Sequence, residues 1–120
     1  MILVDTSIWI DHFRQTNFRL AALLNNSEAL THSFVIGELA LGNMANRNTL
    51  LSLLRNLPRA PLAGDDEVLD LIDRRSLHGA GIGYVDAHLI AATLLAAPAS
   101  LWTGDKRLQS AAARIGISVL

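Results

Sequence analysis

Cysteine is absent from the 120-residue sequence. The chain can therefore form neither a disulfide framework nor a thiolate metal site, and a reducing, cytoplasmic setting is expected. Long apolar runs are also missing. The most apolar stretch, Leu89 to Trp102, is shorter than the roughly 18 residues that a membrane-spanning helix needs, so it belongs to a core. We expect no membrane partner.

An excess of charge of either sign is missing as well. Ten Lys and Arg residues balance eleven Asp and Glu residues, which leaves a net charge of −1. This excludes the basic footprint of dedicated nucleic-acid-binding proteins, so a polyanionic substrate would have to be attracted by local groups or by cations. Hydrophobic residues make up 51% of the chain, enough for one core, and no linker or repeat divides it. We expect one domain over residues 1–120.

Short apolar runs alternate with segments of helical periodicity. This alternation predicts an α/β fold, a single three-layer domain with a central parallel sheet of four to five short strands flanked by helices. The strands are expected at Ile2–Val4, Glu28–Thr31, Ala99–Thr103 and Ile117–Leu120. The helices are expected at Ile8–Phe13, Phe18–Leu24, Ser33–Gly42 (capped by Ser33), Thr49–Leu57, from Asp65 onward, Tyr84–Ala97 and Asp105–Ile115.

Single carboxylates interrupt otherwise uncharged sequence. Asp5 is the only charged residue among the first ten, and Asp86 is the only one between Arg75 and Asp105. Glu38 lies in a similarly uncharged stretch, and neither it nor Asp86 has a basic residue within one helical turn. Because burying an unpaired charge costs several kcal/mol, these isolated acids need a reason to be there.

The predicted topology brings the isolated acids together. Asp5 and Asp105 follow expected strands, Asp86 lies in the first turn of its helix, and Glu38 lies on a helix that leaves the same edge of the sheet. Ligands of open α/β sheets bind at that edge, so the four acids are expected to converge on one cleft. At about 6 Å and an effective dielectric of about 20, each pair would repel by roughly 2.8 kcal/mol. Divalent cations are the natural counterions.

A cleft of carboxylates favours a particular chemistry. Oxygen ligands select Mg²⁺ or Mn²⁺ rather than zinc. Ions held by a few carboxylates keep open positions, which suits hydrolysis of a phosphodiester by activated water. Thr6, Ser7 and Thr103 flank two of the acids and can hold a carboxylate by hydrogen bonds. The candidates for RNA phosphate contacts are Arg14, Lys106 and Arg107.

The four acids lie in four short motifs: Val4–Ile10 (VDTSIWI), Val35–Gly42 (VIGELALG), Tyr84–Ala91 (YVDAHLIA) and Leu101–Leu108 (LWTGDKRL). Together they resemble, in the same order, the acidic motifs of PIN-domain ribonucleases, and most closely those of the VapC toxins of bacterial toxin–antitoxin pairs. The resemblance covers essentially the whole chain.

The resemblance implies a Mg²⁺- or Mn²⁺-dependent endoribonuclease that cuts structured RNA such as tRNA or ribosomal RNA. It also implies neutralisation by a cognate antitoxin, and a homodimer. By the resemblance, Asp5, Glu38, Asp86 and Asp105 fall on the family's metal-coordinating and catalytic acids. Thr103 falls on the small hydroxyl residue that precedes the last acid by two positions.

Other interpretations of the same residues stay open. Asp5, Asp86 and Asp105 could serve only as helix caps. A receiver-like phospho-acceptor domain shares the α/β class, but it needs paired acids after the first strand, where Asp5 stands alone. A haloacid-dehalogenase-like phosphatase needs a second Asp where this chain has Ser7. A catalytically silent PIN-like module that binds RNA or protein is the remaining alternative.

Two further features bear on partners. The four histidines have no metal-ligand spacing, and His88 is expected to be packed or to face a partner. The helices around Phe34–Leu41 and Thr49–Leu57 are apolar around much of their circumference. They predict a surface for a second copy of the chain or for an antitoxin helix.

Overall fold

The computed structural model describes residues 1–120 as three strands and seven helices. Most helix bounds agree with the sequence-based expectation to within about two residues at each end. In chain order the elements are β1 (Ile2–Val4), α1 (Thr6–Arg14), α2 (Phe18–Asn25), β2 (Ala29–Leu30), α3 (Ser33–Leu41), α4 (Arg47–Arg55), α5 (Asp65–Arg74), α6 (Tyr84–Leu95), β3 (Ser100–Trp102) and α7 (Lys106–Arg114).

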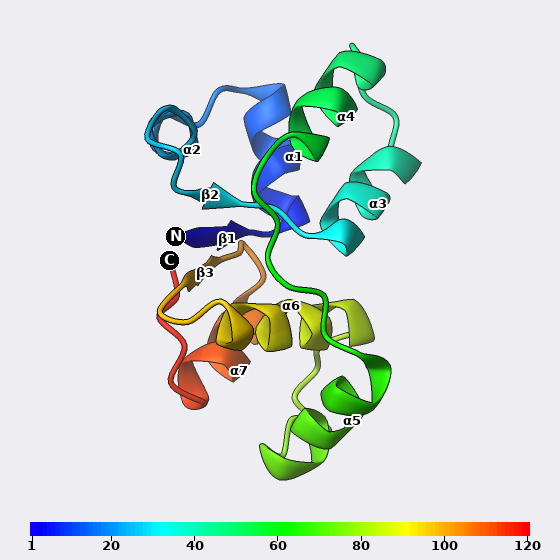
Figure 1. Cartoon of the computed structure of the whole chain (residues 1–120), viewed down its shortest axis with the longest axis vertical. Helices are drawn as coiled ribbons and strands as arrows, with labels where there is room; N and C mark the ends of the chain where they lie inside the picture. The colour runs from blue at the N-terminus through cyan, green and yellow to red at the C-terminus, as the bar shows by residue number, and fades with distance from the viewer.

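The strands form one parallel sheet in the order β2-β1-β3. In Figure 1 helices α1 to α4 gather above this sheet and α5 to α7 below it, so the sheet lies between two groups of helices. Because the strands are parallel, their carboxyl ends share one edge. From that edge the chain leaves β1 for α1, β2 for α3 and β3 for α7. The α/β class and the flanking helices are as expected.

The expectation of four to five strands is wrong, because the sheet has three. Arg59 and Val119 each form only an isolated parallel bridge, with Thr31 and Leu101 respectively. Beside β2 the pairing cannot extend, since Pro58 has no N–H to offer a neighbouring strand. Beside β3, Ile117 donates its N–H to the carbonyl of Ala112 at the end of α7 instead of continuing a ladder.

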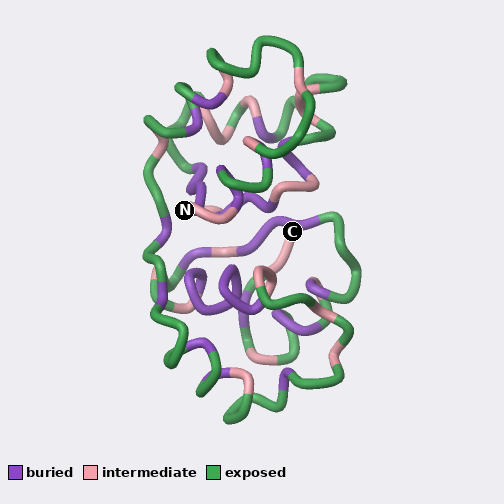
Figure 2. The backbone as a smooth tube through the Cα atoms, turned by 90° about the vertical axis from the view of Figure 1, so that its right-hand side faces the viewer, coloured by how far each residue is buried: buried purple, intermediate pink, exposed green.

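One hydrophobic core of 29 buried residues joins the sheet to the helices on both sides. Figure 2 shows the strands and α6 as the most continuously buried parts of the backbone. Every residue of α6 from Ala87 to Thr93 is buried, so this helix is enclosed by the fold almost all round. None of the seven helices is long and apolar enough to cross a bilayer.

The cap of α3 differs from the expectation. His32, not Ser33, is the N-cap, and its Nδ1 accepts a hydrogen bond of 2.9 Å from the N–H of Phe34. The His32 side chain is fully buried, whereas Ser33 has become the first helical residue. The sequence pointed to Ser33 because serine is a preferred cap, and the buried environment after β2 favoured the histidine.

Candidate functional site

The carboxyl edge of the sheet places Asp5 and Asp105 side by side. Asp5 follows β1 directly, and its N–H donates to the carbonyl of Trp102, the last residue of β3, over 2.9 Å. Asp105 comes three residues later, as the N-cap of α7. Asp86 lies in the first turn of α6, and Glu38 lies in the second half of α3.

Asp5 is held by hydrogen bonds on both carboxylate oxygens. Its side chain is buried, with 7% of the residue exposed. Oδ1 accepts from the N–H of Thr6 at 2.7 Å and so caps α1. Oδ2 accepts from the Thr103 hydroxyl at 2.7 Å and from the Ser7 hydroxyl at 3.4 Å. These bonds compensate part of the cost of burying a carboxylate and fix its orientation.

Thr103 connects the ends of β1 and β3. While its hydroxyl donates to Asp5, it accepts from the N–H of Asp105 at 3.0 Å. Thr103 is 1% exposed, so water does not compete for either bond. Ser7 adds a second link, because its hydroxyl accepts from the N–H of Gly104 at 3.1 Å. The two acids are thus positioned by one connected network.

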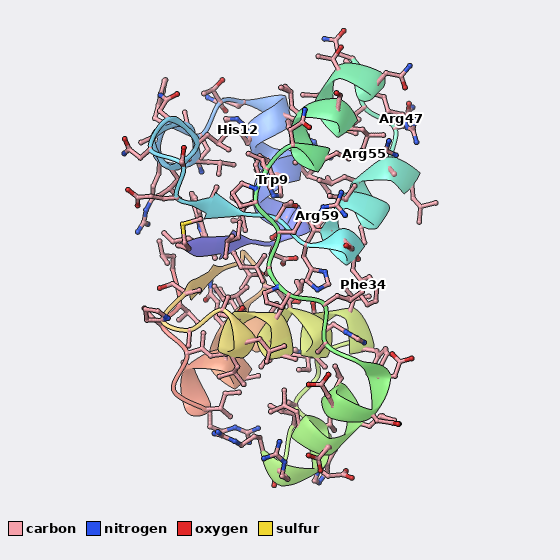
Figure 3. All side chains as sticks on the ribbon, viewed as in Figure 1. Trp9, His12, Phe34, Arg47, Arg55 and Arg59 are labelled. Atoms are coloured by element: carbon pink, nitrogen blue, oxygen red, sulfur yellow. The ribbon has the colours of Figure 1, made fainter.

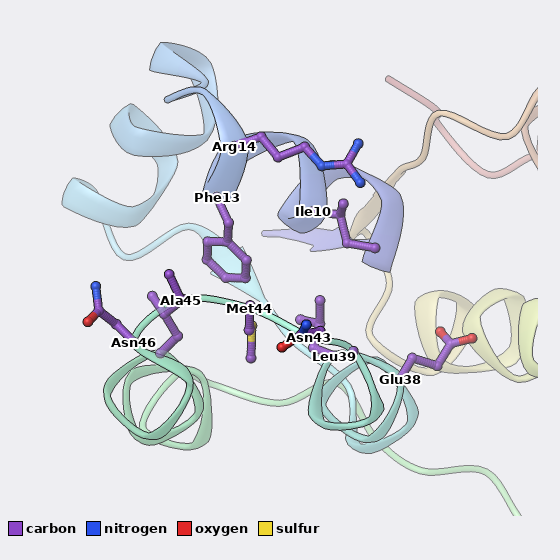
Figure 4. Close-up of a pocket in the computed structure, with 11 residues that line it drawn as sticks. Ile10, Phe13, Arg14, Glu38, Leu39, Asn43, Met44, Ala45 and Asn46 are labelled. Carbon is purple, nitrogen blue, oxygen red and sulfur yellow. The ribbon is translucent and has the colours of Figure 1, made fainter.

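Glu38 reaches the same region from another helix. The Thr6 hydroxyl donates to Glu38 Oε1 over 2.6 Å, which ties α1 to α3. Thr6 also donates its N–H to Asp5, so one residue contacts both carboxylates. Glu38 is exposed, unlike Asp5, and its side chain points into the space between α3 and α6 (Figure 4).

Asp86 lies within electrostatic range of the other three acids. Burial is the largest cause that raises the pKa of Asp86 above its ordinary value. The negative charges of Asp5, Asp105 and Glu38 raise this pKa further, while the hydrogen bond from the Gly83 N–H to its Oδ2 at 3.1 Å lowers it in part. The fold therefore gathers carboxylates from four separate segments of the chain.

Three of the four acids also cap helices. Asp105 Oδ1 accepts from the N–H groups of Arg107 and Leu108 at 2.9 and 3.2 Å. Asp86 accepts a hydrogen bond from the N–H of Gly83, the N-cap of α6, and Asp5 caps α1. Capping and convergence are thus compatible, because a helix N-terminus that faces the carboxyl edge of the sheet brings its capping carboxylate to that edge.

The donor set fits a hard divalent cation. The ion pair of Arg74 with Asp70 and the 3.4 Å contact of His88 with Asp65 leave all four cleft acids without a basic partner. In the present side-chain positions no three acidic or histidine side chains stand close enough together to hold one ion. Several carboxylate oxygens of the four acids instead accept the capping and hydroxyl hydrogen bonds described above, so these side chains would have to turn toward one another to share an ion. Carboxylates without cationic partners are the ligands that Mg²⁺ and Mn²⁺ accept.

The basic candidates lie on two sides of these acids. Arg14 and Glu38 both line a pocket of about 540 Å³ between α1 and the α3–α4 connection (Figure 4). Lys106 and Arg107 open α7 immediately after Asp105. None of the three basic side chains forms an ion pair.

Four aromatic rings near the site form a row of edge-to-face contacts that the sequence did not predict. The rings of His32, Phe34, His88 and Tyr84 follow one another with centroids 5.2, 4.7 and 4.7 Å apart. The Tyr84 hydroxyl donates to Asp65 at 3.0 Å. His88 is 1% exposed and therefore packed, as one of its two expected roles requires. The spacing of Tyr84 and His88 by four residues was the available signal, whereas the contact with α3 was visible only in the fold.

The chain is similar in sequence to known proteins, and its residues 2–114 match the family described as PIN domain. Two sequences named "Ribonuclease VapC32", from Mycobacterium tuberculosis strains CDC 1551 / Oshkosh and ATCC 25618 / H37Rv, are each 50% identical to it over 119 residues, which is 99% of this chain and 96% of theirs. The structure described as "Structure of FitAB bound to IR36 DNA fragment" superposes with a TM-score of 0.64 at 20% identity. That match covers 100% of this chain and 94% of the other, and shows a shared fold.

Proposed function

The chain belongs to the PIN-domain family, and we propose that it is a metal-dependent endoribonuclease, the toxin of a toxin–antitoxin pair, whose catalytic and metal-binding residues are Asp5, Glu38, Asp86 and Asp105. The 50% identity over nearly the full length to proteins named as ribonucleases supports the activity. The family assignment argues against a receiver-like phospho-acceptor domain, for which a single acid after β1 was already too few.

One observation carries the site assignment. Four carboxylates from four segments lie within electrostatic range at the carboxyl edge of the sheet without a basic partner, and burial together with the charges of the other three raises the pKa of Asp86. A fold keeps such an arrangement only if something outside the chain neutralises it. Helix capping alone does not account for it, because Glu38 caps no helix and still lies within range of the other acids.

The residues around the acids have distinct tasks. Thr103 and Ser7 hold the Asp5 carboxylate, and Thr6 holds Glu38, so the ligand oxygens are positioned before any substrate arrives. A bound divalent cation, Mg²⁺ or Mn²⁺, supplies charge neutralisation and Lewis-acid activation of water and of the phosphodiester. Burial of Asp5 and half-burial of Asp86 limit competition from bulk water and strengthen the electrostatic interactions of the cleft.

The substrate is proposed to be structured RNA, such as tRNA or ribosomal RNA. With a net charge of −1, the protein attracts a polyanion only through local groups. Arg14 on one side of the acids, and Lys106 and Arg107 on the other, are placed to contact the phosphates that flank the scissile bond.

Two apolar surfaces support the proposed protein partners. A pocket of about 350 Å³ is lined by eight residues, of which all but His12 are hydrophobic: Trp9, His12, Phe13, Leu24, Leu50, Leu53, Leu54 and Leu57. We propose this pocket, formed largely by α1 and α4, as the seat of an antitoxin helix, because Leu53 is 60% exposed at its rim. Leu41, 91% exposed at the end of α3, supports a homodimer through a separate surface.

The direct test is to incubate purified protein with total RNA in Mg²⁺ or Mn²⁺ and to map the new RNA ends. We expect a small set of cleavage sites, abolished by EDTA and restored by excess Mn²⁺. The Asp86→Asn variant should bind the same RNA and leave it intact. RNA binding by the wild type without cleavage in either metal would instead identify the catalytically silent module.

A further inference from the structure

We propose that the exposed side of α7 is a phosphodiester-binding tract formed by Lys106, Arg107 and Arg114 with Ser110, in which Ser110 and Arg114 extend the phosphate contacts of Lys106 and Arg107 along the RNA backbone, away from the carboxylate cleft. The inference rests on the proposed function, since it extends the path of the same substrate. It starts from a pocket of about 330 Å³ that these four side chains line together with Ala80 and Ala111.

Charge is the first argument for the tract. Its lining contains three basic side chains and no acidic one, although the protein has more acidic than basic residues overall. None of the three forms an ion pair, whereas Arg74 on the neighbouring α5 is paired with Asp70 at 2.8 Å. Unpaired cations that lie close together repel one another, and an anion relieves that repulsion.

Helix geometry makes the tract linear. Lys106, Ser110 and Arg114 are spaced four residues apart, so they form one stripe along α7, and Arg107 lies beside it. At about 1.5 Å per residue the stripe extends over about 12 Å, enough for more than one phosphate of a nucleic acid strand. In Figure 3 nitrogen-tipped side chains gather between the lower end of α7 and the end of α5.

One basic side chain of the tract is hydrogen-bonded to the backbone, and another lies against a glycine. Arg114 donates through Nη2 to the carbonyl of Ser76 at 2.9 Å, after the end of α5, which keeps its guanidinium beside the tract. A guanidinium held in this way loses less side-chain entropy on binding a phosphate. Arg107 lies so close to Gly81 that a Cβ there would come within 2.8 Å of its Cδ, and Gly81 has a φ of +78°, which glycine adopts most readily.

The position of the tract connects it to the cleft. Lys106 follows Asp105 directly, and the loop that holds Arg107 leads through Gly83 into the first turn of α6, where Asp86 lies. An RNA strand that passes the carboxylates can therefore continue along α7 without leaving the protein surface. An acidic protein segment could satisfy the same charges, but the continuity with the cleft favours RNA.

The test measures RNA binding without cleavage. A fluorescein-labelled single-stranded RNA of twenty nucleotides is titrated in EDTA at several salt concentrations, with the wild type and with the triple variant Lys106→Gln, Arg107→Gln and Arg114→Gln. The salt dependence of the logarithm of the binding constant should become shallower by about 0.7 for each lost phosphate contact, about 2 in total, which corresponds to a loss of affinity of about 100-fold at 0.1 M salt.

A matched control removes the same charge elsewhere. Arg47, Arg55 and Arg59 lie in the other half of the molecule, on α4 and the segment that follows it (Figure 3), and their triple Gln variant should keep the wild-type salt dependence. Equal salt dependence in the wild type and the α7 variant would overturn the proposal. The proposal would also be overturned if the α7 variant kept the wild-type salt dependence for RNA but bound polyglutamate more weakly than the wild type does. That result would identify an acidic protein as the partner. EDTA prevents metal-dependent cleavage, so this binding measurement does not depend on the outcome of the nuclease assay.

Discussion

Replacing Thr103 by valine removes one hydroxyl and keeps the shape of the side chain. That hydroxyl donates to Asp5 Oδ2 at 2.7 Å and accepts from the Asp105 N–H at 3.0 Å, at a residue that is 1% exposed. In the variant Asp5 Oδ2 keeps only the long contact with Ser7, at 3.4 Å. We expect Thr103→Val to lose both stability and the positioning of two cleft acids.

The magnitude follows from these two bonds. A hydrogen bond to a charged group contributes about 1.5–3 kcal/mol, and leaving a partly accessible N–H without a partner costs about 1 kcal/mol. The sum, about 2–4 kcal/mol, corresponds to a fall in Tm of about 8–16 °C, since a chain of this length has an unfolding entropy that converts 1 kcal/mol to about 4 °C. The matched variant Thr103→Ser keeps the hydroxyl and loses a methyl group, so it should cost only about 1 kcal/mol.

Thermal unfolding in EDTA and RNA cleavage in Mn²⁺ are measured on the wild type and both variants. The serine variant should have a Tm and a cleavage rate close to those of the wild type, and both quantities should be lower in the valine variant. Equal stability of the two variants would show that the Thr103 hydroxyl does not hold Asp5, and would refute the reasoning.

Two other predictions concern different parts of the molecule. Burial, with a second contribution from His88, lowers the pKa of His32 from 6.5 to about 4. The unfolded chain therefore takes up this proton at higher pH than the folded chain, and stability should fall as the pH drops from 6.5 toward 4, by up to about 3 kcal/mol. His32→Asn keeps a capping side chain and should flatten this dependence; parallel curves for the two proteins in pH-dependent melts would contradict it. Leu53→Arg, at the rim of the apolar pocket, should weaken antitoxin binding at least tenfold in calorimetry while RNA cleavage persists, and unchanged binding would place the antitoxin elsewhere.

The sequence was most informative where single charges stand in apolar surroundings. Asp5, Glu38 and Asp86 were singled out because an isolated carboxylate is costly to bury, and the parallel α/β topology then put them at one edge. The structure brings them within electrostatic range together with Asp105. The order of strands and helices is a local property that the hydrophobic periodicity predicts. In a parallel sheet that order places the residues that follow the strands at the carboxyl edge.

Features that depend on tertiary contacts were not predictable in the same way. The number of strands was overestimated because apolar composition at Ile117–Leu120 indicates a strand, whereas in the fold Ile117 donates its N–H to the carbonyl of Ala112 and only Val119 forms a bridge with β3. The cap of α3 was misassigned because propensity favours Ser33, whereas the burial of His32 and its ring contact with Phe34 exist only in the fold. The hydrogen bond from the Thr103 hydroxyl to Asp5 was likewise not predictable, because it depends on the pairing of β1 with β3.

The central claim is that the four acids share one cation-binding cleft, and the stabilisation by Mn²⁺ tests it most directly. Thermal melts in EDTA and in Mn²⁺ compare the wild type with Asp5→Asn and Asp86→Asn, and with Asp66→Asn as a control on the exposed start of α5. In EDTA Asp86→Asn should be at least as stable as the wild type, because it removes three repulsive pairs and asparagine retains capping ability. In Asp5→Asn the same relief is offset by weaker hydrogen bonds from Thr103 and Ser7, which lose their charged acceptor. In Mn²⁺ both cleft variants should gain less stability than the wild type and the control. Equal gains in all four proteins would contradict the shared cleft.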